Sequence, residues 1–201
     1  MATTGSAAPV ALVTGATSGI GRAVALKLAG DGFTVVVHGR DASRGADVVA
    51  AIEAAGGQAR FAAADLGNAE DVDRLAAAAG PVDVLVNNGG FSWFGPTPMA
   101  GHVGLAGGAA YGATKASMTA LSRAWAAEFS PAGVRINTVA PGPVYSDGAD
   151  PERIKALGAT TLLGRAAQVG EIAEVIAFLA SPKASYITGA LIPVDGGRTA
   201  V

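Results

Sequence analysis

The chain has 201 residues, of which 50% are hydrophobic and 15% are charged, so it is long enough to bury a full core in one globular domain. Its formal net charge of −2 argues against nucleic acid and anionic membrane surfaces as partners. The absence of cysteine excludes a disulfide framework and a thiolate site, and it favours a cytoplasmic location.

Targeting signals, membrane spans and metal sites are not expected either. Residues 1–9 have neither the basic start nor the long apolar stretch of a signal peptide, and no run approaches the ~18 apolar residues that a membrane span needs. The two histidines, His38 and His102, lie far apart in the sequence and have no carboxylate motif around them. We therefore predict no metal site.

The first predicted element is a buried strand at Val10–Thr14, because this run is short, apolar and β-branched. It leads into the glycine-rich segment Gly15–Gly21 and then into the helical pattern of Arg22–Ala29. Such a turn directs backbone N–H groups and a helix N-terminus at one point, where a phosphate can bind. We predict that a nucleotide binds here; a plain strand-to-helix turn is the alternative.

Three glycines of that segment each have a separate reason for their position. Gly15 would allow the tight turn, Gly19 would let a pyrophosphate approach the backbone, and Gly21 would let the helix pack closely on the strand. The spacing is G-x-x-x-G-x-G, which differs from the G-x-G-x-x-G of the commonest dinucleotide fingerprint.

Strands and helices alternate along the rest of the chain. The further predicted strands are Phe33–His38, Gln58–Ala63, Val82–Val86, Val134–Val139 and Ala190–Val194. The further predicted helices are Ala42–Ala55, Ala69–Ala79, Ala110–Phe129, a short one from Pro151, and Glu171–Ala180. Repeated units of this kind build a parallel sheet with helices on both faces. We predict an α/β fold, a Rossmann-type doubly wound parallel sheet that forms one domain over residues 1–201.

Small polar residues follow the predicted strands, at the edge of the sheet where ligands of such folds bind. The segments concerned are His38-Gly39-Arg40, Ala64-Asp65-Leu66, Asn87-Asn88-Gly89-Gly90 and Ala140-Pro141-Gly142-Pro143-Val144. Ordinary loop chemistry is the alternative for each one taken alone. Their recurrence along one rim, together with the glycine-rich turn, favours a ligand site.

Tyr111 and Lys115 are spaced i and i+4 at the start of the long predicted helix, so their side chains project from one face about 6 Å apart. An ammonium beside a phenol favours the phenolate and lowers a pKa that is otherwise near 10. A phenol tuned in this way can exchange a proton with a hydroxyl or carbonyl oxygen. The alternative is an ordinary exposed pair.

Taken in order, these motifs resemble the short-chain dehydrogenases/reductases, and most closely their 3-oxoacyl-acyl-carrier-protein-reductase-like members. The resemblance covers nearly all of the chain. It rests on Thr14-Gly15-x-x-x-Gly19-x-Gly21, Asp65, Asn87-Asn88-x-Gly90, Tyr111-x-x-x-Lys115, Pro141-Gly142 and Asp195-Gly196-Gly197.

The resemblance implies reversible hydride transfer between a nicotinamide and a small-molecule carbonyl or secondary alcohol, with Tyr111 as general acid/base. Lys115 would hold the nicotinamide ribose and activate the tyrosine. Asp65 and Leu66 would lie around the adenine, and Gly89 stands where the family more often has alanine, which we expect to matter little. The implied cofactor-binding residues are Gly15, Ala16, Thr17, Ser18, Gly19, Ile20, Gly21, Arg40, Asp65, Leu66, Asn87, Gly89, Tyr111, Lys115, Pro141, Gly142, Val144 and Ser146, the last two near the carboxamide.

The end of the second strand bears on the choice of cofactor. An acidic residue there would bind the ribose hydroxyls and repel a 2′-phosphate. That position is Gly39, and the adjacent Arg40 has a guanidinium that can bind a phosphate through two hydrogen bonds, unless it is simply a solvated charge. We predict NADP (NADPH) as the preferred cofactor, with NAD also admitted.

One departure from the family is large. Only twenty residues, Phe91 to Ala110, separate Asn-Asn-Gly-Gly from Tyr111, whereas family members also have a helix and a central strand that ends in the catalytic serine. The shortfall is roughly forty residues, a little over one βαβ repeat less its shared strand. The serine position is occupied by Pro98, and neither Ser92 nor Ser117 is a good substitute.

Two explanations of the shortfall stay open. The natural protein has a stretch that this sequence lacks, or the chain is truly short and strand, crossover helix and next strand still form a right-handed parallel unit. A true excision would remove a donor to the developing oxyanion, which typically costs 10²–10³ in rate. A catalytically impaired dinucleotide-binding protein is therefore the alternative function.

The long predicted helix also bears on assembly. It carries Ala116, Ala120, Ala124 and Ala127 together with Met118, Leu121 and Trp125, so it is apolar around much of its circumference. We predict a homo-oligomer: a homotetramer if the absent helix exists, and otherwise a dimer through Ile172–Leu179 and Ala190–Val194.

Overall fold

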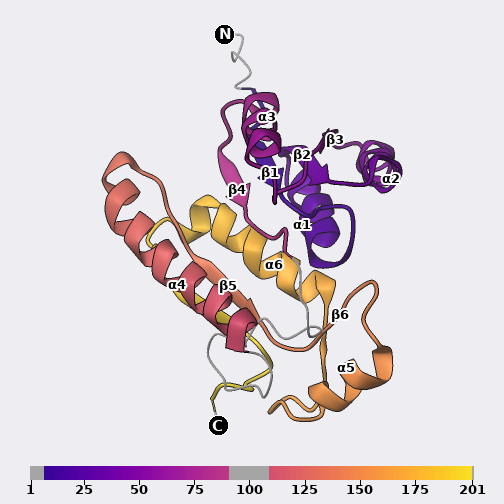
Figure 1. Cartoon of the computed structure of the whole chain (residues 1–201), viewed down its shortest axis with the longest axis vertical. Coiled ribbons are helices and arrows are strands. Elements are labelled where there is room, and N and C mark those ends of the chain that lie inside the picture. Colours follow the sequence, from indigo (N-terminus) through magenta and orange to yellow (C-terminus); the bar gives the residue numbers. More distant parts are fainter. Residues whose placement is uncertain (1–6, 91–108, 201) are drawn as a thin grey trace. The chain divides into compact units, whose positions relative to one another are not determined.

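A computed structural model of the chain describes residues 7–90 and 109–200. It divides into two compact units, Met1–Gly90 and Phe91–Val201, each with strands and helices of its own (Figure 1). The single domain predicted over residues 1–201 stays a prediction.

The first unit is a parallel four-stranded sheet with three helices, in the strand order β3-β2-β1-β4. The strands are β1 Val10–Val13, β2 Thr34–Gly39, β3 Gln58–Ala63 and β4 Val84–Val86. The helices are α1 Gly19–Gly30, α2 Ala42–Ala54 and α3 Ala69–Ala79. Parallel pairing with a helix in each connection confirms the predicted Rossmann-type α/β fold for this part.

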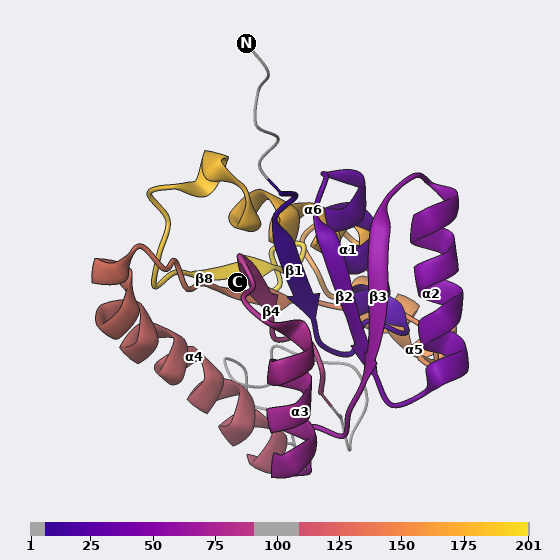
Figure 2. The ribbon, with the colours of Figure 1, turned by 90° about the horizontal axis from the view of Figure 1, so that it is seen from above.

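The two faces of this sheet are covered unequally (Figure 2). Because successive side chains of a strand point to opposite faces, Val13, Val35 and Val37 share the face that α1 and α2 cover, and all three are fully buried. Leu12 and Val36 share the other face with Leu75 and Ala79 of α3 and with Ala64. Because the four strands are parallel, their carboxyl ends meet at one edge of the sheet, which is packed between helices on its two faces.

The edge strand β4 is an exception to this burial. Leu85 pairs in register with Leu12, yet its exposed fraction is 53%, against 7% for Leu12. Among the three helices of the first unit, α3 is the one that packs on this face, and Leu85 is not part of the buried cluster that it forms with Leu12 and Val36. The edge strand thus leaves a large apolar side chain in contact with water.

The second unit contains three helices and two short parallel sheets. Its helices are α4 Ala109–Phe129, α5 Pro151–Gly158 and α6 Val169–Ala180, with the short 3-10 turns Ser130–Ala132 and Pro182–Ala184. The strands β5 Thr138–Pro141 and β8 Leu191–Val194 form one sheet, and β6 Val144–Tyr145 and β7 Ala167–Gln168 form the other.

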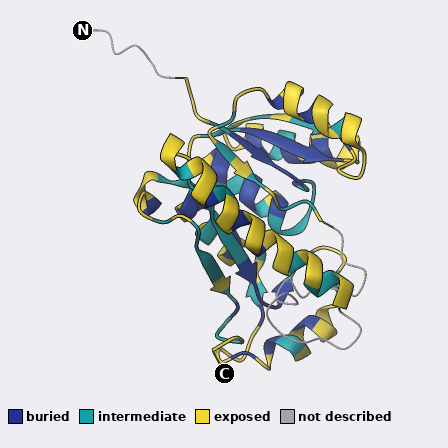
Figure 3. Cartoon of the chain, turned by 60° about the vertical axis from the view of Figure 1, so that its left-hand side comes forward, coloured by how far each residue is buried: buried dark blue, intermediate teal, exposed yellow. Residues whose placement is uncertain are grey.

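The helix α4 is largely exposed along its length. Its buried residues are Thr119, Ser122 and Ala126, and the exposed fractions of Met118 and Leu121 are 38% and 41%. Helices with long exposed faces contrast in Figure 3 with the buried strands of the four-stranded sheet. Apolar side chains are therefore exposed on this helix, and its role in an oligomer interface stays a prediction.

The predicted elements differ from the observed ones in three respects. The strand predicted at Val134–Val139 begins only at Thr138, because Arg135 donates to the carbonyl oxygens of Leu179 and Ser181 and keeps the preceding residues in a loop. The two-residue strands β6 and β7 are too short to give a sequence signal. The strands also lie in three sheets instead of one, with β4 at an edge. None of the helices in the described part of the chain is long and apolar enough to span a membrane.

Candidate functional site

The glycine-rich turn between β1 and α1 is held against the end of β4. The Thr14 hydroxyl accepts hydrogen bonds from the backbone N–H groups of Asn88 and Gly89 at 3.0 and 2.8 Å. The Asn88 side chain donates to the carbonyl oxygens of Thr14 and Gly15 at 3.0 and 3.3 Å. These four bonds place the segment after β4 next to the turn, as expected for two strands that end at one rim.

Two glycines of the turn are required by its shape. Gly15 has a φ of +63°, and a Cβ there would lie 2.8 Å from the Cα of Gly89. A Cβ on Gly21 would overlap the carbonyl oxygen of Gly15 and the side chain of Asn88. The reasons predicted for these two glycines, a tight turn and close packing, are confirmed.

The N-terminus of α1 has no acidic or capping side chain. The Ser18 hydroxyl makes no capping hydrogen bond, and the first turn has no acidic residue. By contrast, Asp41 caps α2 and Asn68 caps α3. The positive end of the α1 dipole therefore has no side-chain counterpart of its own, and this is the arrangement that suits a phosphate.

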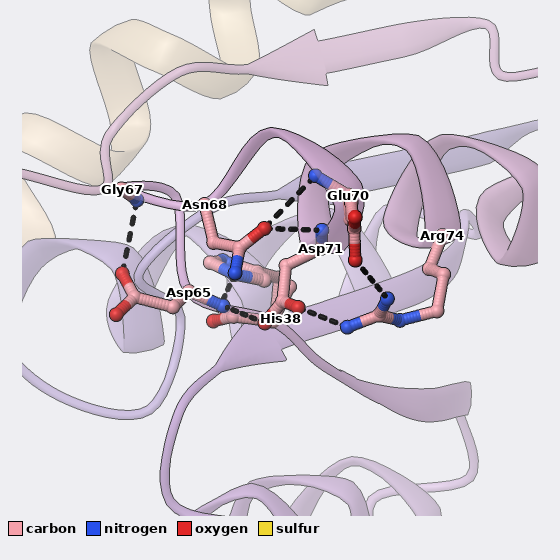
Figure 4. A network of polar contacts seen from close by, with 8 residues as sticks. His38, Asp65, Gly67, Asn68, Glu70, Asp71 and Arg74 are labelled. Atoms are coloured by element: carbon pink, nitrogen blue, oxygen red, sulfur yellow. Dashed lines mark hydrogen bonds and ion pairs between the residues drawn. The ribbon is translucent and has the colours of Figure 1, made fainter.

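The sequence places His38 on the rim but assigns it no role, and the structure brings its side chain to the glycine-rich turn. Its Nδ1 accepts a hydrogen bond from Gly15 N–H at 3.1 Å, and its Nε2 lies 3.2 Å from the carbonyl oxygen of Ala64. Burial lowers the pKa of this imidazole. The only sequence signal is a polar residue that ends an apolar strand directly before Gly39. Figure 4 shows His38 beside the loop from Asp65 to the start of α3.

The end of β2 offers one unpaired guanidinium. Arg40 is exposed and has no hydrogen-bond or ion-pair partner within residues 7–90 and 109–200. Arg44, one turn further along, is instead paired with Asp41 at 3.1 Å. A Cβ on Gly39 would overlap the methyl group of Thr17, so any larger residue at that position would have to displace the Thr17 side chain.

The segment after β3 is ordered by its own hydrogen bonds. Asp65 Oδ1 accepts from Gly67 N–H at 2.9 Å, and Asp65 N–H donates to Asp71 Oδ2 at 2.8 Å (Figure 4). Leu66 is 42% exposed. A Cβ on Gly89 would lie 2.8 Å from the Cδ1 of Leu66, so the alanine common in the family would displace this side chain.

Tyr111 and Lys115 share one face of α4, as predicted. The Lys115 Nζ lies 5.5 Å from the centroid of the Tyr111 ring, which is within cation–π range. Both side chains are half-buried, and this burial raises the pKa of Tyr111 and lowers the pKa of Lys115. The predicted lowering of the Tyr111 pKa is therefore not found in this structure, because desolvation disfavours the charged form of each group.

The remaining predicted residues lie at β5 and β6 of the second unit: Pro141 ends β5, Gly142 follows it, Val144 begins β6 and Ser146 follows that strand. Pro141, Gly142 and Val144 are buried. Gly142 N–H donates to the carbonyl oxygen of Val194 at 3.0 Å, and a Cβ there would lie 2.7 Å from the Cα of Asp195. The carbonyl oxygen of Ser146 accepts from Ala149 N–H at 3.1 Å.

The predicted site residues thus fall into two groups. The first unit holds Gly15, Ala16, Thr17, Ser18, Gly19, Ile20, Gly21, Arg40, Asp65, Leu66, Asn87 and Gly89 at the carboxyl ends of its strands. The second unit holds Tyr111, Lys115, Pro141, Gly142, Val144 and Ser146. Within residues 7–90 and 109–200 no cluster of potential metal ligands occurs.

Of the two serines weighed as substitutes for the family serine, Ser117 is the one that lies within the described residues. Pro98 and Ser92 lie outside the described residues. Ser117 is exposed and donates to the carbonyl oxygen of Thr114 at 2.8 Å, so its hydroxyl is bound to its own helix.

Known protein families match consecutive parts of the chain. The family described as short chain dehydrogenase matches residues 9–99, and the family described as Enoyl-(Acyl carrier protein) reductase matches residues 95–199. The chain is 37% identical to an uncharacterized oxidoreductase of Methylorubrum extorquens and 35% identical to a 3-oxoacyl-[acyl-carrier-protein] reductase of Synechocystis, in both cases over 94% of this chain and 96% of the relative.

A solved structure agrees with this assignment. The structure of an angucycline C-6 ketoreductase with bound NADP superimposes with a TM-score of 0.88 at 29% identity, over 96% of either chain. The chain therefore belongs to the short-chain dehydrogenase/reductase family, and it is an oxidoreductase of that family.

The alignments also measure what this chain lacks. The match to the Methylorubrum relative runs over 239 positions, whereas 94% of 201 residues is only about 189 residues, so about 50 positions of the relative face no residue of this chain. This is close to the predicted shortfall of about forty. The two family matches meet at residues 95–99, within the interval Phe91 to Ala110 where the shortfall is predicted.

Proposed function

We propose that the protein is an NADP(H)-dependent ketoreductase that interconverts a small-molecule ketone and the corresponding secondary alcohol. The observation that carries this proposal is the glycine-rich turn at the uncapped N-terminus of α1, with the unpaired Arg40 at the end of the neighbouring strand β2. NADP is the cofactor of the ketoreductase of known structure that this chain resembles.

The residues of the first unit fit the adenosine half of the cofactor. The backbone of Thr17–Gly21 and the α1 dipole would bind the pyrophosphate. The guanidinium of Arg40 would pair with the 2′-phosphate, and glycine at position 39 lacks the acidic group that selects NAD. Asp65 and Leu66 would border the adenine.

Residues of the second unit would carry out the proton transfer that accompanies the transfer of hydride. The bound nicotinamide supplies the hydride. Tyr111, whose raised pKa keeps its phenol protonated at neutral pH, would donate a proton to the nascent alkoxide oxygen. Lys115, with its ammonium 5.5 Å from the ring of Tyr111, would hold the nicotinamide ribose and stabilise the phenolate that remains. Asn87 and Gly89, with Pro141, Gly142, Val144 and Ser146, would border the rest of the cofactor.

Two measurements test this proposal. NADPH binding is followed by its fluorescence, and turnover is followed as NADPH oxidation with acetoacetyl-CoA, a 3-oxoacyl thioester chosen because of the 3-oxoacyl-reductase relative. We expect binding, and turnover that disappears in Tyr111→Phe while NADPH binding is kept. Near-normal turnover by Tyr111→Phe would contradict the role of the tyrosine.

A second function has an observation in its favour. About 50 positions of the relative have no counterpart in this chain, and the family serine falls in the interval where the shortfall is predicted. If the natural chain is this short, loss of the oxyanion donor would reduce the rate about 10²–10³-fold. The protein would then act mainly as a dinucleotide-binding protein. NADPH binding without oxidation across a panel of ketones, together with a native mass equal to that of these 201 residues, would select this function.

The proposal includes a location and an assembly. We place the protein in the cytoplasm because it has no cysteine, and we propose a homo-oligomer through the exposed apolar side chains of α4 and α6. These include Met118, Leu121 and Phe178.

A further inference from the structure

His38 uses both ring nitrogens to fasten the glycine turn to the neighbouring strands. Gly15 N–H donates to Nδ1 at 3.1 Å, and Nε2 lies 3.2 Å from the carbonyl oxygen of Ala64 at the end of β3. The main chain adds a third link, because Ala16 N–H donates to the carbonyl oxygen of His38 at 2.8 Å. The first two residues of the turn are thus bound to one residue of β2.

The hydrogen bonds define the protonation state of the ring. A backbone N–H pointing at Nδ1 requires a lone pair on that nitrogen, so the proton of the neutral ring lies on Nε2 and is donated to the Ala64 oxygen. An imidazolium has an N–H group on both nitrogens. If His38 were protonated, its Nδ1–H and the Gly15 N–H would both be donors and would point at each other with no acceptor between them.

We propose that His38 is a pH-sensitive positioning residue for the cofactor site: its neutral ring holds Gly15 in the conformation that receives the dinucleotide phosphate, and its protonation releases the turn. The inference rests on the proposed function, because it names a determinant of the same cofactor site. Gly15 is at φ +63° and packs against Gly89, so a loss of its hydrogen bond shifts the turn where the phosphate would bind.

Few charged groups surround this ring. On the side of β3 and α3 they are Asp65, Asp71 and Arg74, of which Asp71 is engaged by the backbone of Asp65 and by the Arg74 side chain (Figure 4). The segment Val10–Gly21 of β1 and the turn contains no charged residue, and the nearest charged residues along α1 and β2 are Arg22 and Arg40. Burial, and not a neighbouring charge, lowers the pKa of His38.

The direction of the pH effect follows from that cause. The pKa of His38 in the folded protein is lower than its ordinary value of 6.5. The unfolded chain therefore binds the proton more readily. The hydrogen bond from Gly15 N–H to the neutral His38 ring is fully present above about pH 6.5, and it is lost as the pH falls through the lower pKa of His38 in the folded protein.

Two substitutions separate the functions of the two nitrogens. In His38→Asn the side-chain oxygen takes the position of Nδ1 and accepts from Gly15 N–H without titrating, whereas His38→Gln keeps a donor near the position of Nε2 and loses the acceptor. We measure NADPH affinity by fluorescence from about pH 8 to about pH 5 in all three proteins. NADPH itself titrates in this range, so the readout is the ratio of wild-type affinity to that of His38→Asn at each pH.

We expect this ratio to fall on acidification, by up to about tenfold per pH unit below the pKa of His38, and His38→Gln to bind weakly at every pH. A constant ratio, or normal binding by His38→Gln, would overturn the inference.

If no variant binds a dinucleotide, the proposed function has failed, and the hydrogen bond between His38 and Gly15 is then tested by itself with NMR. In His102→Gln only one imidazole remains, and the Gly15 amide signal should titrate with it. A Gly15 signal that ignores the imidazole would also overturn the inference.

Discussion

Single residues in this protein owe their chemistry to what surrounds them. Arg40 and Arg44 are both exposed arginines near the start of α2, but only Arg44 is neutralised, by Asp41. Tyr111 and Lys115 have the spacing of a phenolate–ammonium pair, yet burial favours the neutral form of both. In each case the residue type indicates a capability, and the surroundings decide whether the group is paired, as in Arg44, or desolvated, as in Tyr111 and Lys115.

Arg40 and Arg44 provide a matched test of cofactor choice. We expect Arg40→Ala to weaken NADPH binding about tenfold or more and to leave NADH binding unchanged, because only NADPH has the 2′-phosphate that a guanidinium can bind through two hydrogen bonds. Arg44→Ala should change neither affinity, since its side chain is paired with Asp41. Fluorescence titration of both cofactors measures this, and equal effects of the two substitutions would contradict the assignment.

The ionisation of Tyr111 can be measured in the protein without cofactor. Because burial raises the pKa of Tyr111, its phenol should stay protonated through neutral pH and ionise only above about pH 10. The difference in phenolate absorbance between the wild type and Tyr111→Phe, recorded as the pH rises, isolates this group from Tyr145 and Tyr186. A midpoint near neutrality would instead support the phenolate pairing predicted from the sequence.

At the scale of elements, the helices and strands of the first unit agree closely with the sequence pattern. The exception is the edge strand β4, whose apolar pattern predicts burial although Leu85 is exposed. The predicted β3 and α3 have the observed bounds. The buried strands β1 and β2 are apolar on both faces because helices lie on both. At β4 the same apolar pattern continues, but α3 does not extend over Leu85.

Leu12 and Leu85 test how much this edge contributes to stability. They are the same residue type, face the same side of the sheet and pair in register. We expect Leu12→Ala to lower the free energy of unfolding by about 2–5 kcal/mol and Leu85→Ala to lower it by about 1 kcal/mol or less. Urea unfolding followed by circular dichroism measures both. A large loss in Leu85→Ala would indicate that a further segment or a second copy covers β4 in solution.

At the scale of the whole molecule, the two units and the shortfall against relatives bear on assembly. The relatives align along nearly their whole length, yet about 50 of their positions are unmatched. Exposed apolar side chains occur on α4, on β4 and at Phe178 of α6, and also at Leu162 and Leu163 after α5. Each is a surface that a second copy of the chain could bury.

The state of assembly distinguishes the two explanations of the shortfall. For these 201 residues we expect a dimer that uses the C-terminal interface, and for a longer natural chain a tetramer, by light scattering at micromolar concentration. Phe178→Asp should dissociate the dimer, whereas Leu121→Asp on α4 should leave it intact, since both side chains are about 40% exposed but only Phe178 lies in the proposed C-terminal interface. A monomer in the unsubstituted protein would contradict both versions.

The sequence by itself determined the order of the elements and the family, and it supplied the predicted cofactor and catalytic motifs. These depend on local spacing: alternating apolar runs, a glycine-rich turn after a strand, and i, i+4 pairs on a helix. It also located the shortfall, because the motifs on both sides of Phe91 to Ala110 are complete.

Only the tertiary structure decided what depends on neighbours far apart in the chain. His38 became part of the glycine turn because β2 pairs with β1 and β3, which brings Gly15 and Ala64 to its two ring nitrogens. The direction of the Tyr111 pKa followed from burial, which the spacing of two residues on a helix cannot reveal. Leu85 is exposed although its partner Leu12 is buried, because it lies outside the cluster that α3 covers within the first unit. Hydrogen bonding across strands, desolvation and coverage of a face are properties of packed elements, so no local pattern specifies them.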